Sequence, residues 1–185
     1  MAQIGFFHKL WLTRFSKPAG DRVLYRHVLK NTPRRIIEMG IGTLGRAERL
    51  LGLVNSLQQA DGGLHYVGLD RFEARLPSDV PGVSLKQAHQ RLHSLARVQL
   101  VPGNIDSSLS RLCNHLGVFD LVLISADNDE RHLERSWFFI QRIINAQSTI
   151  LFETRATGTS CREWKVVDKA QIDRLASQTL LKRAG

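Results

Sequence analysis

IIEMGIGTLG, at residues 36–45, joins a short apolar run to a glycine-rich turn. The apolar run predicts a buried strand at 34–38, and the pattern that follows predicts a helix at 46–59. The three glycines between them have the spacing GxGxxG. Glycines at this spacing let the backbone turn tightly and bring the N–H groups of a helix start close to a ligand. We therefore expect a ligand to bind where this first strand ends.

The rest of the chain repeats the alternation of strand and helix. The run FDLVLIS at 119–125 is almost wholly apolar, which is typical of a strand buried on both faces of a parallel sheet. The alternation predicts an α/β fold with a doubly wound, mostly parallel sheet flanked by helices, which binds ligands beyond the carboxyl ends of its strands. The expected strands are 34–38, 65–70, 98–102, 119–125, 149–152 and 162–167, and the expected helices are 1–17, 22–31, 46–59, 83–95, 107–116, 129–145 and 169–182.

Two carboxylates narrow the class of ligand. Asp70 ends the second expected strand, where a carboxylate accepts hydrogen bonds from ribose hydroxyls. Together with the glycine turn it indicates an adenosine-containing ligand. Glu38 favours S-adenosylmethionine over a nicotinamide cofactor, because a carboxylate at this place repels a pyrophosphate and suits a positively charged ligand. The alternative is that Glu38 bonds to nearby backbone or to a basic residue of the N-terminal helices.

The order of four segments resembles the class I S-adenosylmethionine-dependent methyltransferases. The segments are IIEMGIGTLG, YVGLD, VPGNIDSSLSRL and FDLVLISAD, and the resemblance covers about residues 20–154. It implies a Rossmann-like sheet, S-adenosylmethionine as the cofactor and transfer of a methyl group. The acceptor is unknown, and we expect a small molecule.

The resemblance also implies roles for individual residues. Glu38, Gly40 and Gly42 would line the methionine and ribose part of the cofactor, and Asp70 would hold the ribose hydroxyls. Further along the chain, the adenine contacts would be Asn104, by a polar bond, and Ile105, by packing, and the residues beside the transferred methyl group would be Ser125, Ala126 and Asp127.

Asp127 is the candidate catalytic residue, as a general base, with His132 as a weaker candidate. The alternative reading of Asp127 is a helix cap. Related O-methyltransferases hold a divalent metal with three ligands after the fourth and fifth strands. Here Asp127 and Glu153 are present but the third ligand is missing, so we expect no metal site. A second departure is Leu44, which stands where the family pattern usually has its third glycine.

The charge of the chain is concentrated at its ends. The formal net charge is +9, which divides into +7 for residues 1–35, −2 for 36–154 and +4 for 155–185. We expect a single domain over 1–185, with a basic helical extension at 1–33, a cofactor-binding core at 34–154 and a short strand and helix at 155–185. The basic ends suggest an anionic substrate, a second copy of the chain or, with less support, nucleic acid as partners.

The first helix carries Phe7, Leu10, Trp11 and Phe15 on one stripe. An aromatic stripe at helical spacing predicts a helix packed on its own domain. The alternatives are a basic amphipathic helix on a membrane surface or a transit peptide. We also expect the N-terminal helices to cover the substrate. No apolar run is long enough for a transmembrane segment.

Three classes of function therefore stay open. The first is a small-molecule methyltransferase, the second a non-catalytic protein that binds S-adenosylmethionine or a nucleotide, and the third, with least support, a NAD-binding protein. The two cysteines, Cys113 and Cys161, form no CxxC pair, so we expect no structural zinc site and a reducing, cytoplasmic setting.

Overall fold

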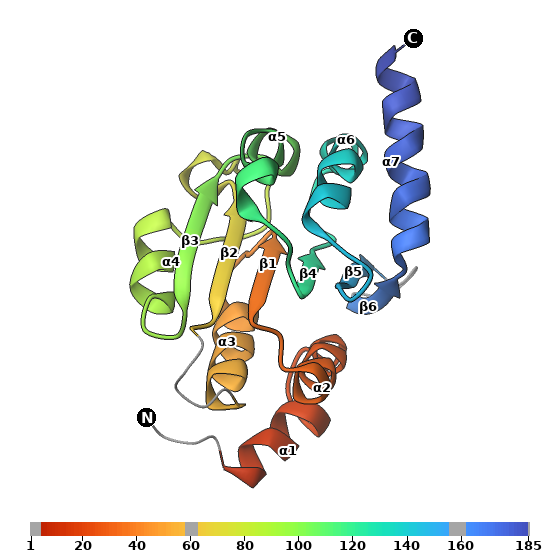
Figure 1. Ribbon diagram of the computed structural model, residues 1–185. Helices are drawn as coiled ribbons and strands as arrows, with labels where there is room; N and C mark the ends of the chain where they lie inside the picture. The colour runs from red at the N-terminus through yellow and green to blue at the C-terminus, as the bar shows by residue number, and fades with distance from the viewer. Residues whose placement is uncertain (1–4, 58–62, 156–161, 185) are drawn as a thin grey trace.

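The computed structural model describes residues 5–57, 63–155 and 162–184, and they form a six-stranded sheet with helices on both faces (Figure 1). The strand order is β3-β2-β1-β4-β5-β6. Five strands run parallel, and β6 pairs antiparallel with β5. The strands are β1 (Arg35–Met39), β2 (His65–Asp70), β3 (Arg97–Pro102), β4 (Leu121–Ile124), β5 (Thr149–Arg155) and β6 (Arg162–Val167).

The switch in strand order lies between β1 and β4. The chain runs outward from β1 through β2 to β3 and then returns to the other side of β1 as β4. The loops that leave the carboxyl ends of β1 and β4 therefore diverge, which opens a crevice at the top of the sheet. The predicted doubly wound, Rossmann-like sheet is confirmed.

One face of the sheet is covered by the first half of the chain. Alternate strand residues, such as Ile36, Tyr66 and Leu123, point to this face and are fully buried. A 3-10 turn, η1 (Ala19–Asp21), leads into the covering layer and contacts β6. The helices of this face are α2 (Arg22–Asn31), α3 (Gly45–Leu57) and α4 (Leu85–Leu92).

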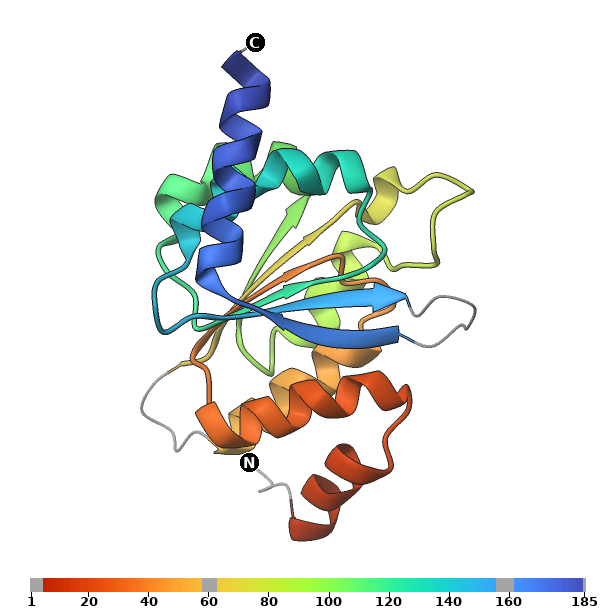
Figure 2. The same ribbon diagram turned by 90° about the vertical axis from the view of Figure 1, so that its right-hand side faces the viewer.

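The other face is covered by the second half of the chain. Ile37, Val67 and Val122 point to it and are buried against these helices. Figure 2 shows the two layers on opposite sides of the sheet, with the C-terminal helix on the outside of the second. The elements of this layer are α5 (Ile105–Leu116), α6 (Glu130–Ile140), the 3-10 turn η3 (Gln141–Ile143) and α7 (Lys169–Ala184).

Several predicted boundaries need correction. The helix expected at 129–145 ends at Ile140, because the chain tightens into η3 before it turns back to β5. The strand expected at 119–125 pairs only from Leu121 to Ile124. Phe119 precedes the strand but is buried. Its apolar side chain therefore made the predicted strand begin too early. The sixth strand is confirmed, and it closes the side of the sheet next to β5.

The first helix packs on its own domain as predicted, but not through its aromatic stripe. Helix α1 (Phe6–Arg14) contacts α2 and lies on the far side of α2 from the sheet (Figures 1 and 2). Leu12 is fully buried in this contact. The exposed fractions of the stripe are 83% for Phe7, 38% for Leu10, 47% for Trp11 and 63% for Phe15. The prediction that this stripe is core was wrong, because a helix in the outermost position buries only the side that faces α2. No helix in the described ranges is long and apolar enough to cross a membrane.

Candidate functional site

A cavity of about 390 Å³ opens at the carboxyl ends of the strands. We call it the strand-end pocket. Its walls come from the turn after β1 and from the segments that follow β2, β3 and β4, so it lies at the switch in strand order. No described residue before Gly40 lines it, so the expectation that the N-terminal helices cover the site is wrong for α1 and α2. Its lining residues include Gly40, Gly42, Asp70, Arg71, Arg75, Asn104, Ile105, Asp127 and His132.

The glycine turn forms the floor of the pocket. Gly40 and Gly42 have φ values of +87° and +64°, which favour glycine. A Cβ on Gly40 would lie 3.0 Å from the Cβ of Ser125, so this glycine also lets the end of β1 approach the end of β4. Leu44 adopts φ +72° as well, although it is not glycine, and its side chain is fully buried. The departure from the family pattern is therefore accommodated by a left-handed leucine whose packing offsets the strain.

Asp70 holds this turn in place. Its Oδ2 accepts hydrogen bonds from the N–H groups of Ile41 at 2.9 Å and Gly42 at 3.1 Å, and its Oδ1 accepts one from the N–H of Phe72 at 2.9 Å. Arg75 donates from Nη2 to both oxygens, at 2.7 and 2.6 Å. The carboxylate has about four lone-pair sites, and these donors use them all. A ribose hydroxyl can bond to Asp70 only if Arg75 moves away.

The wall after β3 carries the two residues expected to contact adenine. Asn104 precedes the first residue of α5, and its Oδ1 accepts a hydrogen bond from Arg71 Nε at 2.9 Å. Its Nδ2 lies 3.3 Å from Nε2 of His132, and Nδ1 of His132 lies 3.0 Å from Oδ1 of Asp106. Ile105 is almost fully buried beside them. The structure thus brings the amide and the apolar side chain to one wall, together with a histidine backed by a carboxylate.

Glu38 lies behind the pocket and is fully buried on the face of the sheet covered by α3. Its Oε1 accepts a hydrogen bond from Arg46 Nε at 2.8 Å, and its Oε2 accepts one from Tyr66 Oη at 2.7 Å. Burial raises the pKa of Glu38, against the opposing effects of Arg46 and Tyr66. The alternative stated from the sequence was that Glu38 bonds to nearby backbone or to a basic residue of the N-terminal helices. Glu38 does bind a basic residue, but this residue, Arg46, comes from α3.

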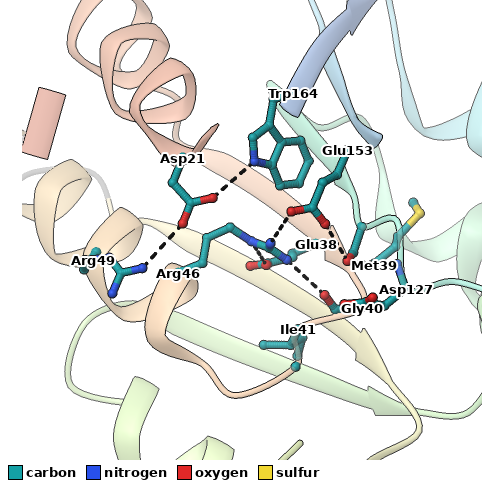
Figure 3. Close-up of polar contacts among 12 residues, drawn as sticks. Asp21, Glu38, Met39, Gly40, Ile41, Arg46, Arg49, Asp127, Glu153 and Trp164 are labelled. Atoms are coloured by element: carbon teal, nitrogen blue, oxygen red, sulfur yellow. Dashed lines mark hydrogen bonds and ion pairs between the residues drawn. The ribbon is translucent and has the colours of Figure 1, made fainter. Parts of the chain in front are cut away.

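Arg46 is the centre of a buried cluster (Figure 3). Besides Glu38, its guanidinium lies 3.4 Å from Glu153 Oε1 and donates to the Gly40 carbonyl oxygen at 3.1 Å. It also lies 4.9 Å from the centre of the Trp164 ring. Burial by itself favours loss of the Arg46 proton, but the surrounding carboxylates outweigh this effect and raise its pKa. One side chain therefore ties α3 to β1, β5 and β6.

The N-terminal segment joins the same cluster through Asp21. Trp164 donates from Nε1 to Asp21 Oδ1 at 3.2 Å, and Arg49 lies 3.4 Å from Oδ2 (Figure 3). Burial raises the pKa of Asp21, and the nearby Arg46, Trp164 and Arg49 oppose that effect. We call Asp21, Glu38, Arg46, Glu153 and Trp164 the Arg46 cluster.

Ser125 and Asp127 follow β4, and they differ in their surroundings. Ser125 is buried, and its hydroxyl donates to Glu153 Oε2 at 2.9 Å. Asp127 lines the pocket, where it is bound by Arg162 at 2.6 Å and Arg155 at 2.7 Å. Burial raises the pKa of Asp127, but the hydrogen bonds and charges of the two arginines are together stronger, so its pKa is lowered. A carboxylate in this state is a weak proton acceptor.

The two carboxylates that a metal would use are bridged by an arginine. Arg162 Nη1 lies 2.6 Å from Asp127 Oδ2 and 3.3 Å from Glu153 Oε2. Within 5–57, 63–155 and 162–184, no group of three or more His, Cys, Asp or Glu side chains is arranged to hold a metal ion. The guanidinium occupies the position between the carboxylates in which a cation would sit.

Five arginines of the site were missed in the sequence, namely Arg46, Arg71, Arg75, Arg155 and Arg162. Arg46 follows the glycine turn directly, Arg75 lies five residues after Asp70, and Arg162 begins β6. Arg46 and Arg75 lie close to strand ends in the sequence. Basic residues are also common on exposed helix faces, so nothing in the sequence distinguished these two. Arg162 reaches the site only because β6 pairs with β5.

Comparison with solved structures shows the fold. No protein-family model and no curated protein sequence matches the chain. The O-methyltransferase TomG from Streptomyces achromogenes, in complex with SAM, has a TM-score of 0.56 and 14% identity over 90% of this chain and 69% of its own. An O-methyltransferase from Bacillus cereus in complex with SAH has a TM-score of 0.56 and 14% identity over 93% of this chain and 76% of its own. The SAH-bound methyltransferase PaMTH1 from Podospora anserina has a TM-score of 0.54 and 15% identity over 94% and 77%. The chain has the Rossmann-like fold of the class I S-adenosylmethionine-dependent methyltransferases.

Proposed function

We propose that this chain is an S-adenosylmethionine-dependent methyltransferase that acts on a small molecule. The observation that carries the proposal is the strand-end pocket, which gathers the glycine turn, Asp70, Asn104 and Ile105 at the switch in strand order. Its volume of about 390 Å³ is within the range of ligand sites, roughly 300–1,000 Å³. The fold shared with SAM- and SAH-bound methyltransferases supports the same cofactor.

Within this proposal each wall of the pocket holds one part of the cofactor. Gly40 and Gly42 leave their backbone open to it, Asp70 holds the ribose after Arg75 has turned away, and Asn104 and Ile105 hold the adenine ring. When bound, the cofactor supplies a methyl group on a positively charged sulfur. Glu38 and Ser125, which were also expected at the cofactor, lie in the buried layer behind the pocket, where they position the ends of β1 and β4.

Asp127 stays the candidate for the residue that faces the acceptor. Two arginines lower its pKa, so it removes a proton only slowly at neutral pH. We therefore assign most of the rate to proximity and orientation of the acceptor, which methyl transfer can use as its main source of catalysis. In this view Asp127, Arg155 and Arg162 form a polar rim that orients the acceptor.

The proposed division of the chain follows from the same site. Among the described residues, 34–154 supply all those that line the pocket, while 1–33 contribute Asp21 and 155–185 contribute the partners of Asp127 to the supporting layer. A cytoplasmic setting stays the proposal made from the two cysteines, of which Cys113 is buried and free.

A second candidate is a protein that binds an adenosine ligand without catalysis. One observation favours it: Arg155 and Arg162 bind Asp127 and lower its pKa, which makes this carboxylate a weak proton acceptor. The pairing of Glu38 with Arg46 also makes NAD less unfavourable as a ligand. The negative charge of Glu38 was expected to repel the pyrophosphate, and the positive charge of Arg46 offsets it.

Calorimetric titration with S-adenosylmethionine, S-adenosylhomocysteine and NAD tests these candidates. The proposal predicts binding of the first two and transfer of a labelled methyl group to a component of a small-molecule extract. Binding of both without transfer to any acceptor supports the non-catalytic candidate. Failure of both to bind at millimolar concentration, or preference for NAD, overturns the proposal.

A further inference from the structure

The outer side of α1 combines exposed aromatic groups with positive charge. We call Phe7, Leu10, Trp11 and Phe15 the aromatic face of α1. Phe7, Trp11 and Phe15 are spaced four residues apart, so they lie along one side of the helix. All four side chains are at least 38% exposed, while Leu12 on the other side is fully buried against the protein. The outward side of the helix is therefore apolar and largely exposed to solvent.

Two basic side chains lie at the C-terminal end of this face, and a third, Lys9, lies on the other side of the helix. Arg14 and Lys17 are exposed at the end of α1 and just beyond it, and Lys9 is half-buried. No ion pair joins any of these three to an acid within the part of the chain that the structure describes. Asp21 is the one acid in residues 1–35, and it is buried in the Arg46 cluster. The end of the molecule that presents the aromatic face thus exposes positive charge with no acid of its own segment to balance it.

We propose that the aromatic face of α1 docks on the surface of an anionic phospholipid bilayer. Tryptophan and phenylalanine beside lysine and arginine are the side chains that bind at the boundary between headgroups and acyl chains. The basic residues supply the attraction to anionic headgroups, and the aromatic groups supply the apolar burial. The position of α1 favours this partner, because α1 is the outermost layer below α2 and can meet a flat surface without moving the sheet (Figures 1 and 2).

Other occupants fit this face less well. A second copy docked face to face would bring Arg14 and Lys17 against the same cations of its partner, which opposes association. Single-stranded RNA would meet the positive charge, but it requires a groove that follows the backbone, and α1 presents a convex helix. Both become outcomes of the test.

Trp11 is a natural reporter for this docking. The other two tryptophans, Trp137 and Trp164, are buried, so a change in fluorescence on docking comes from Trp11. We expect a blue shift with phosphatidylcholine vesicles that contain phosphatidylglycerol and none with phosphatidylcholine alone. Trp11→Phe should keep the binding, measured by vesicle flotation, and lose the shift.

Three variants and two controls decide the proposal. Trp11→Ser and Phe15→Ser should each weaken vesicle binding at least tenfold, since each removes a large apolar side chain from the interface. Arg14→Glu combined with Lys17→Glu should weaken it at least as much and remove its dependence on salt. Val166→Ser, at another exposed apolar position, and Arg174→Glu on α7 are the matched controls and should bind like the parent chain.

The proposal is overturned if the parent chain ignores the anionic vesicles at low salt, or if the Trp11 and Phe15 variants bind as well as the controls. It is also overturned if Trp11→Ser abolishes a dimer seen in the absence of lipid, or if the chain prefers single-stranded RNA to the vesicles. Thermal unfolding of each variant confirms that it is folded. Because α1 contributes no residue to the strand-end pocket, these results do not depend on the proposed methyltransferase activity.

Discussion

Arg46 on α3 and Glu38 on β1 form an ion pair in the interior, with Nε 2.8 Å from Oε1 and the carboxylate fully buried. The pair joins the glycine turn to the layer beneath it, because the same guanidinium also binds the Gly40 carbonyl. The glycine turn, which was expected to bind a ligand, is therefore held in place by the ion pair of Arg46 and Glu38, which lies behind the pocket.

Replacing Arg46 tests how much the fold depends on this pair. Arg46→Leu leaves Glu38 and Glu153 buried without their shared cation, and we expect the free energy of unfolding in urea to fall by about 3–5 kcal/mol. Adding Glu38→Gln should restore part of the loss. The control is Arg91→Ala, which breaks an exposed pair with Glu48 and should cost at most about 1 kcal/mol. Equal effects of the two arginine variants would contradict this account.

The pH dependence of stability should report on Asp127. Its pKa in the folded chain is below the usual value of 3.8, so its contribution is present above that value and is lost as the pH falls through the lowered pKa. Asp127→Asn should therefore destabilise the protein by about 1–2 kcal/mol at pH 7 and by progressively less below pH ~4. Arg162→Met removes the strongest partner and should reduce the same pH dependence. A gap between parent and Asp127→Asn that stays constant down to pH ~2 would show that Asp127 gains nothing from its charge.

Arg75 and Asp70 should have opposite effects on ligand binding. Arg75→Ala frees the carboxylate, and we expect S-adenosylhomocysteine to bind several-fold more tightly. Asp70→Asn removes the charged acceptor and loosens the glycine turn, so binding should weaken about tenfold or more. Calorimetry measures both, with circular dichroism as the check on folding. If Arg75→Ala weakens binding as much as Asp70→Asn does, then the guanidinium belongs to the ligand site and is not a competitor.

Two glycines offer a matched test of packing between the N-terminal segment and β6. A Cβ on Gly20 would lie 2.1 Å from the carbonyl oxygen of Arg162, which is backbone and cannot rotate away. Gly20→Ala should destabilise the chain by about 1–3 kcal/mol through overpacking. A Cβ on Gly52, inside α3, meets nothing within 4 Å, so Gly52→Ala should stabilise the chain by about 0.5–1 kcal/mol. Melting temperatures that move in the same direction for both would refute this reading.

Much of the site's location was predictable from local patterns. The apolar runs and glycine turn predicted the strands, and parallel strands bring their carboxyl ends to one edge. Gly40, Asp70, Asn104 and Asp127 all line one pocket for that reason. Their roles toward a cofactor stay predictions, since the fold alone does not assign them.

The charge pairing was not predictable, because it depends on contacts between distant segments. Arg46 and Glu153 are 107 residues apart, and Asp21 and Trp164 are 143 apart. Any of the 26 basic residues could have been the partner of a given carboxylate until the strand order was known. The same holds for the first helix, whose aromatic stripe was expected to be core.

The sequence by itself determined the order of strands and helices and the edge of the sheet where the pocket lies, because both follow from local periodicity and the direction of parallel strands. Only the tertiary structure decided which cations neutralise Glu38, Asp70 and Asp127, and which side of α1 is exposed. Burial and ion pairing depend on which segments become neighbours, and the antiparallel addition of β6 beside β5 is what brings Arg162 and Trp164 to the site.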